Sequence, residues 1–505
     1  MTLYITRVLG IVLILAPLSC ISSPKASSKL PTILVSSGTQ DPFDPEQSAQ
    51  SSFTLRYSFY CHAFELQPDQ TLRPDVVRSF RWSPDYRQLT LEIDPAARFH
   101  DGKAVTTQDL EYALVRPFLA TRGEAERAYA IIGAEHIKSG SPFQSGMLSG
   151  IKIQDAKTLT ISLKYPDNTL PAWLSSDATR IVPFGVLADD HATFEKTPVS
   201  CGDYAVVHRT ADGSVYRMKK HRGPADAPAE LELWNYAFDK LPAKPDIMQG
   251  GHFPKDKVDN SYYRFQWGET PVMVFTLVLN DKAPLVKEAA FRKALDLAIP
   301  RQKIASYRND IPTRDLTAPG SPADLGLPVI ENLDEAKRLW ITLPKGLRER
   351  TYRIVIKTNY PGPYFKLIED NLRTIGMKVS LIAKQMRHFE SSDEDALALG
   401  IGFILLKANP VAMYQRFDRR NLHADPIPAF AQPELQELID AYKPQFEAPG
   451  IQAASQKIAH YVLGRNLVIP ITYSRQLLAL SPHVKSYAGA WDAGINLRLI
   501  RVESK

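Results

Sequence analysis

The octet Val-Met-Val-Phe-Thr-Leu-Val-Leu at residues 272–279 constrains the fold of this chain more than any other segment. A half-buried strand alternates apolar and polar residues, whereas a nearly unbroken apolar run is typical of a strand buried on both faces. Four residues then follow at the spacing of one helix face: Phe291, Ala294, Leu295 and Ala298. This order predicts a sheet that is covered by helices.

Strand and helix patterns alternate through the rest of the chain. Residues 352–356 alternate like a strand, residues 368–375 form a helical stripe that stops at Gly376, and residues 379–381 alternate again. This succession predicts a βαβ unit. Earlier stretches, for example residues 89–93, also alternate like strands. The sequence therefore predicts a mixed α/β fold.

The length of 505 residues exceeds what one hydrophobic core can organise, since single cores stop growing near roughly 250–300 residues. Two or three domains are expected, with natural breaks near Gly268 and Pro470. The formal net charge is only +6, and no run of five like charges occurs, so a nucleic-acid partner is not indicated.

Residues 1–19 have the layout of a secretory signal peptide, with one cation before an apolar run that is too short to cross a bilayer. Cys20 ends this segment after a small residue and resembles the acylated cysteine of the bacterial lipobox, although Pro17 stands where that motif usually has Leu. Ordinary cleavage nearby is the alternative. Residues 20–30, rich in Ser, Lys and Pro, are then expected to form a flexible tether between a lipid anchor and a globular body.

Motifs of catalysis and metal binding are missing from the sequence. It contains no G-x-S-x-G, no P-loop pattern, no H-E-x-x-H and no G-x-G-x-x-G. Its histidines form no H-x-H or H-x-x-x-H pair, so we expect no metal site, no cofactor and no enzyme activity. Cys61 and Cys201 could pair in an oxidising compartment or remain as two buried thiols. The many aromatic residues suit a protein that encloses a ligand.

Several segments resemble the peptide and nickel class of solute-binding proteins that serve ABC importers. The stretch from Leu89 to Tyr112 is similar to that family's strand, F-H-D-G turn and capped helix. In it, Asp101-Gly102 supplies the turn and Thr106-Thr-Gln-Asp109 is a capping box. Pro198-Val-Ser-Cys-Gly-Asp-Tyr204 resembles the family's P-x-G-T-G-P-Y motif. The likeness covers nearly all of the chain after the signal peptide.

The resemblance implies a type II, two-lobe periplasmic-binding-protein fold, with an extra inserted subdomain and a ligand held in the cleft between the lobes. It assigns residues 31–55, 170–268 and 470–505 to the first lobe, 56–169 to the inserted subdomain, and 269–469 to the second lobe. The breaks near Gly268 and Pro470, which come from the residue patterns, fall at the implied hinges.

In peptide-binding members of this family a W-x-x-D-x-x-D-P segment lines the cleft, and its first Asp neutralises the α-amino group of the ligand. The matching stretch here has Phe403 at the Trp position, Leu406 at the first Asp position, Lys407 beside it and Asn409 at the second Asp position. A buried ammonium without a partner is costly. Either another carboxylate takes over or the ligand lacks a free amine. Lys407 could attract a carboxylate or phosphate, or could lie on the surface.

Tyr60 and Tyr129 are the other candidate wall residues of the cleft, and each could instead pack in a core. Tyr60 stands in a stretch similar to the family's Y-E-G-L, in which Cys61 replaces the Glu and removes a second acid. His62 is expected to be a structural histidine.

The resemblance implies a monomeric receptor outside the cytoplasm, anchored to the membrane through lipidated Cys20. It would capture oligopeptides and deliver them to ABC transporter permease subunits, with no cofactor and no nucleic-acid partner. Two alternatives remain open. The same fold could bind a metal chelate, a sugar or an anionic metabolite, or it could serve as a ligand sensor that does not transport.

Overall fold

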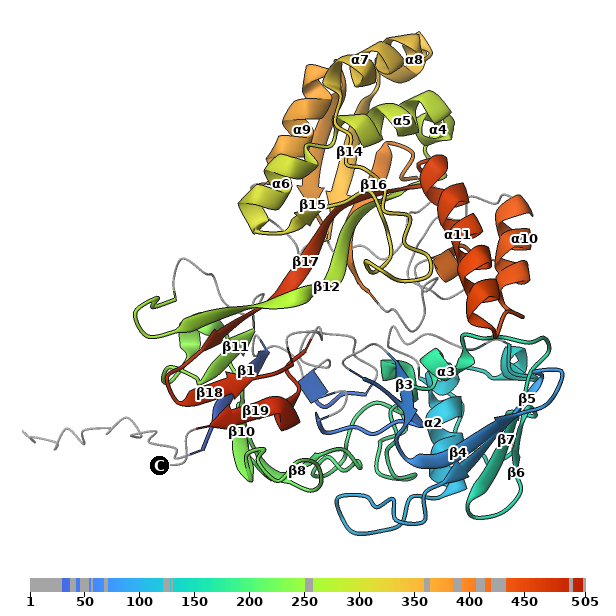
Figure 1. Cartoon of the computed structure of the whole chain (residues 1–505), viewed down its shortest axis with the longest axis vertical. Coiled ribbons are helices and arrows are strands. Elements are labelled where there is room, and N and C mark those ends of the chain that lie inside the picture. Colours follow the sequence, from blue (N-terminus) through green and yellow to red (C-terminus); the bar gives the residue numbers. More distant parts are fainter. Residues whose placement is uncertain are drawn as a thin grey trace, which may run out of the picture.

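The computed structural model describes residues 30–36, 42–45, 54–55, 58–67, 71–120, 128, 130–249, 258–357, 364–384, 392–405, 414–418, 433–489 and 494–502. Figure 1 shows two bodies joined by the long strands β12 (Arg264–Leu279) and β17 (Val468–Leu480). The part of the chain before β12, together with the part after β17, forms the first body. The part between β12 and β17 forms the second body, which lies uppermost in the figure.

One sheet runs through both bodies in the order β15-β14-β16-β12-β17-β11-β1-β10-β9-β8, with β13 also paired to β17. Its strands in the first body are β1 (Thr32–Ser36), β8 (Tyr204–Arg209), β9 (Val215–Lys220), β10 (Glu230–Asn235) and β11 (Ile247–Gln249). A two-stranded ribbon near the carboxyl end of the chain consists of β18 (Val484–Tyr487) and β19 (Ile500–Val502).

A separate four-stranded sheet in the first body has the order β4-β5-β7-β6. Its strands are β4 (Val77–Trp82), β5 (Gln88–Ile93), β6 (Ile151–Ile153) and β7 (Thr158–Ser162). Nearby elements are the hairpin of β2 (Phe64–Leu66) and β3 (Leu72–Pro74) and the helices α2 (Thr107–Leu119) and α3 (Leu170–Trp173). The predicted capping box is confirmed, because Thr106 and Asp109 each accept a hydrogen bond from the backbone N–H of the other.

The second body holds most of the helices. Its strands are β13 (Ile311–Pro312), β14 (Thr351–Ile356), β15 (Lys378–Ala383) and β16 (Ala396–Ile404). Its helices are α4 (Pro284–Lys287), α5 (Ala289–Ala298), α6 (Arg301–Arg308), α7 (Leu333–Thr342), α8 (Lys345–Arg348), α9 (Phe365–Thr374), α10 (Pro433–Tyr442) and α11 (Ala448–Gly464).

The apolar octet is buried on both faces, as predicted. Phe275 and Leu277 pack in one cluster with residues of α5, α7 and α9. Val274 and Val278 point the other way and pack with residues of α10 and α11. Because both faces of β12 are covered, seven of the eight positions hold apolar side chains, and the eighth, Thr276, is itself fully buried. This arrangement anchors the second body around a single central strand.

The predicted βαβ unit is also confirmed. β14 and β15 pair in parallel, and α9 connects them. Gly376 follows the helix with a φ of 101°, a left-handed conformation that favours glycine at the end of a helix. Among the described helices, none is long and apolar enough to cross a membrane.

Candidate functional site

The junction of the two bodies is a pair of antiparallel strands with an interrupted ladder. Trp267 pairs with Leu477, but the next pairs are Pro271 with Arg475 and Met273 with Ser474. Residues 268–270 of β12 therefore lie opposite Gln476 alone. Fewer ladder hydrogen bonds hold the strands at this point, so rotation between the bodies costs least here. We propose the hinge at this interruption.

The predicted boundary at Pro470 lies a few residues earlier on β17, where Pro470 pairs with Thr276. The division of the chain into lobes at residues 268 and 470 remains a prediction.

A dense polar cluster packs against β17 beside the junction. The Arg308 guanidinium, at the end of α6, contacts Asp310 and donates to the Tyr364 hydroxyl at 2.6 Å and to the Ser474 hydroxyl at 3.1 Å. Asp310 also accepts from Thr472 at 3.0 Å and Ser474 at 2.9 Å. Burial lowers the pKa of Arg308, but Asp310 and Tyr364 together outweigh burial and raise this pKa above its ordinary value. The cluster is therefore charged and well hydrogen-bonded, and it fixes this face of β17.

Arg475 lies on the other face of β17, because neighbouring residues of a strand point to opposite sides. Tyr473, two positions earlier, shares its face and packs in one cluster with Phe403. The Arg475 guanidinium lies over the Trp267 ring, 5.7 Å from the ring centroid. Its Nε atom is buried without a hydrogen-bond partner, and none of the described residues forms an ion pair with it. A partly buried cation next to the junction is therefore available to an anion.

Of the predicted wall residues, Tyr60 and Phe403 lie within the described structure. Tyr60 is fully buried; its hydroxyl donates to the Phe43 carbonyl at 2.5 Å, and the Arg180 guanidinium lies over its ring. Phe403 is 5% exposed and packs among residues of the second body. Both side chains thus contribute to cores in this conformation, and their ligand contacts stay predictions. The remaining predicted residues lie outside the described residues: Cys20, Tyr129, Leu406, Lys407 and Asn409.

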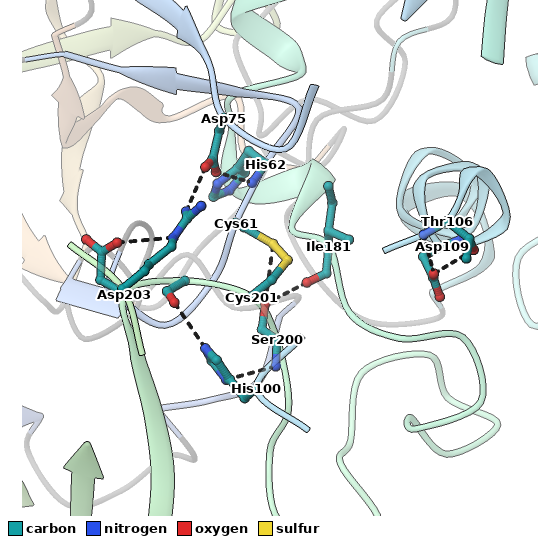
Figure 2. The surroundings of a disulfide bond; sticks show 12 residues. Cys61, His62, Asp75, His100, Thr106, Asp109, Ile181, Ser200, Cys201 and Asp203 are labelled. Carbon is teal, nitrogen blue, oxygen red and sulfur yellow. Dashed lines mark hydrogen bonds and ion pairs between the residues drawn. A yellow bond between two sulfur atoms is a disulfide. The ribbon is translucent and has the colours of Figure 1, made fainter. Parts of the chain in front are cut away.

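The family-like motifs converge on a disulfide rather than on a reactive centre (Figure 2). Cys61 and Cys201 are bonded, which decides between the two alternatives that the sequence left open. Next to them, the Ser200 hydroxyl donates to the Ile181 carbonyl at 2.6 Å. His100, from the F-H-D-G turn, bonds the Ser200 backbone N–H and the Gly202 carbonyl through its two ring nitrogens. These contacts tie three distant segments of the first body together.

An ion network borders the disulfide. Arg222 bridges Asp75 at 2.6 Å and Asp203 at 3.2 Å, and Asp75 also accepts the His62 backbone N–H at 2.9 Å. Burial raises the pKa of Asp203, and Arg222 together with Arg498 offsets only part of that rise. In the described part of the chain, no group of three or more His, Cys, Asp or Glu side chains could hold a metal ion. The network is structural, and His62 takes part in it through its backbone N–H, so the structural role of the imidazole stays a prediction.

Comparison with known proteins gives these features a context. The family model "Bacterial extracellular solute-binding proteins, family 5 Middle" matches residues 71–223, which include the F-H-D-G turn, the capped helix and the disulfide segment. The dipeptide-binding protein DppE of Bacillus subtilis (strain 168) is 22% identical over 471 residues, covering 83% of this chain and 82% of that protein. The chain is therefore similar to family 5 of the bacterial extracellular solute-binding proteins, through residues 71–223 and through its match to DppE.

Solved structures of family 5 proteins share the fold of this chain. NikA from Brucella suis in complex with Fe(III)-EDTA has a TM-score of 0.75 at 18% identity. The match covers 94% of this chain and 100% of NikA. AgaA from A. tumefaciens R10 in complex with agropinic acid has a TM-score of 0.73 at 18% identity. The match covers 94% of this chain and 99% of AgaA. A dipeptide-binding protein from Pseudoalteromonas sp. SM9913 in complex with Met-Leu has a TM-score of 0.71 at 15% identity. The match covers 94% of this chain and 100% of the dipeptide-binding protein.

The chain therefore has the periplasmic-binding-protein fold expected from its motifs. Members of the family act outside the cytoplasm as binding components of transport systems and are not enzymes. Sequence reasoning missed the Trp267–Arg475 pair, although one signal was available: an arginine that interrupts an apolar strand next to a predicted hinge.

Proposed function

We propose that this protein captures short peptides outside the cytoplasm and delivers them to an ABC transporter permease. The match to DppE over most of both chains supports a peptide ligand, as does the shared fold with the Met-Leu complex. The two bodies would close over the ligand by rotating about the junction of β12 and β17. Extended backbone groups at the closed site would bind the peptide main chain and so tolerate many side chains.

The partly buried cation at the junction supports a ligand that bears a carboxylate, as a peptide does. Met-Leu, agropinic acid and EDTA differ in shape, but each of them bears at least one carboxylate. A guanidinium binds a carboxylate through two parallel hydrogen bonds, and burial strengthens that interaction. Arg475 stands at the junction without an ion-pair partner among the described residues. We assign it to the carboxylate of the ligand.

A second candidate ligand is a single carboxylate-bearing compound that is not a peptide, such as a metal chelate or an anionic metabolite. Leu406 favours it, because this residue stands where peptide-binding relatives are expected to have the Asp that neutralises an α-amino group. The ligands of NikA and AgaA show that this fold accommodates such compounds.

Native mass spectrometry of the protein purified without refolding tests the two candidates directly. Under the peptide proposal, the protein carries a spread of masses that shift with peptide length and composition. One discrete added mass that does not fragment into amino acids would instead favour the non-peptide ligand. If the protein carries nothing and binds no member of a peptide library, the peptide proposal is wrong.

The role of Arg475 can be tested by Arg475→Gln, which keeps the polarity and part of the length of the side chain but removes the charge. A charge-assisted hydrogen bond is worth about 1.5–3 kcal/mol, so we expect the affinity for Met-Leu to fall about tenfold or more. Isothermal titration calorimetry gives the affinity.

Arg209→Gln is the matched control, because the Arg209 guanidinium also lies over an aromatic ring, that of Tyr216, but away from the junction. Its affinity should equal that of the unmodified protein. An equal loss in both variants would contradict the assignment of Arg475.

A further inference from the structure

Lys443 joins the two bodies far from the junction strands. It follows α10 in the second body, and its ammonium lies 3.1 Å from Asp418 of the same body. The same ammonium lies 3.2 Å from Asp167 of the first body and over the ring of Tyr165. The side chains of Lys443, Asp167 and Asp418 are 9%, 8% and 4% exposed. The Lys443 ammonium thus lies between two carboxylates, one from each body, and all three side chains are largely shielded from water.

Backbone hydrogen bonds reinforce this contact. The Asn168 N–H donates to the Lys443 carbonyl at 2.9 Å. The Asn168 side-chain amide donates to the Tyr442 carbonyl at 3.2 Å and to the Gln445 carbonyl at 2.7 Å. The Tyr442 carbonyl is the last of α10, where carbonyls have no partner within the helix, and the Lys443 and Gln445 carbonyls follow in the turn after it.

An aromatic stack completes the contact. The Phe446 ring of the second body lies parallel to the Tyr86 ring of the first body, with centroids 3.9 Å apart and an angle of 12° between the planes. Trp82 packs edge-on against Phe446 at 5.2 Å. We name the contact of Tyr442–Phe446 with Trp82, Tyr86 and Tyr165–Asn168 the latch.

The latch and the junction lie at opposite sides of the molecule. In Figure 1 the lower end of α10 meets the first body near α3 and β5, whereas β12 and β17 cross between the bodies on the other side. Rotation about the junction that separates the bodies must therefore break the latch. Breaking it removes the Asn168 hydrogen bonds, separates Lys443 from Asp167 and separates the stacked rings, so the latch stabilises the closed arrangement by its own contacts.

We propose that the latch holds the two bodies together without a ligand and thereby sets the affinity for every ligand alike. Its effect on affinity rests on the proposed binding function, whereas its effect on closure does not. The apparent affinity is the intrinsic affinity reduced by the fraction of molecules in the binding-competent arrangement. Loosening the latch lowers that fraction while leaving the groups that touch the ligand unchanged.

Small-angle X-ray scattering of the ligand-free protein tests closure directly. Phe446→Ala should increase the radius of gyration relative to the unmodified protein. Tyr86→Asn, which suits the positive φ of 54° at that position, should do the same. The double variant should expand no more than either single variant, because both substitutions remove the same stack. Phe80→Ala is the control, since Phe80 is an exposed aromatic residue whose ring packs on Phe64 of its own body.

Binding of the dipeptide Met-Leu supplies the second readout. Phe446→Ala should bind it about fivefold more weakly, and Phe80→Ala should bind it like the unmodified protein. Equal radii of gyration for the unmodified protein, Phe446→Ala and Phe80→Ala would overturn the latch. If the unmodified protein itself fails to bind peptides, that result counts against the peptide proposal alone, and the scattering comparison still decides the latch.

Discussion

Gly202 shows how a single residue fixes the region around the disulfide. A Cβ atom at this position would lie 2.5 Å from the backbone carbonyl carbon of Phe59 and 2.7 Å from the Tyr60 carbonyl oxygen, so no side chain fits. The close approach lets the Gly202 N–H donate to the Phe59 carbonyl at 2.9 Å and places its own carbonyl on His100. The glycine of the motif is therefore explained by backbone contact and not by ligand binding.

His100 makes the stability of the first body depend on pH. Burial lowers the pKa of its imidazole to about 3, so the ring stays neutral in the folded protein at pH values where the unfolded chain binds a proton. Between about pH 6.5 and pH 3 the unfolded chain thus holds more protons, and the free energy of unfolding falls as the pH falls. His100→Gln should show a shallower fall over this range in urea titrations. Parallel curves for the two proteins would contradict this role.

At the scale of elements, local patterns predicted the framework well. The octet, the βαβ unit and the capping box depend on residues within a few positions of one another, and sequence periodicity records such relations directly. The latch and the Trp267–Arg475 pair depend on contacts between residues about two hundred or more positions apart. No local pattern specifies which distant side chain will lie opposite, so these features required the structure.

The cap of α2 gives a prediction at this scale. Thr106→Ala removes the side chain that accepts the Asp109 N–H, and losing such a cap costs about 1 kcal/mol of stability. Chemical denaturation should detect the loss. Thr342→Ala is the control, because the exposed Thr342 hydroxyl at the end of α7 only bonds back to the Leu339 carbonyl. Equal stabilities of the two variants would show that the cap contributes little.

At the scale of the whole molecule, the described body begins at Leu30, and we propose that lipidated Cys20 tethers it to the membrane. Cys20→Ser should release the protein from the membrane fraction of the producing cells into the soluble extracytoplasmic fraction. The midpoint of thermal unfolding should not change, because the sequence places Cys20 in a tether that precedes the described body. Ser22→Ala is the matched control and should stay in the membrane fraction. Retention of Cys20→Ser there would contradict lipidation.

The path of the chain through its two bodies has a consequence for the order in which they form. The second body is one continuous stretch between β12 and β17, so it can assemble once that stretch has been delivered. The first body cannot, because its early residues bond to the last ones: the Thr54 hydroxyl accepts the Ile495 N–H at 3.1 Å, and the Ser58 hydroxyl accepts the Leu497 N–H at 3.1 Å. The part of the first body that leaves the ribosome first must therefore wait for the residues after β17 before these contacts can form.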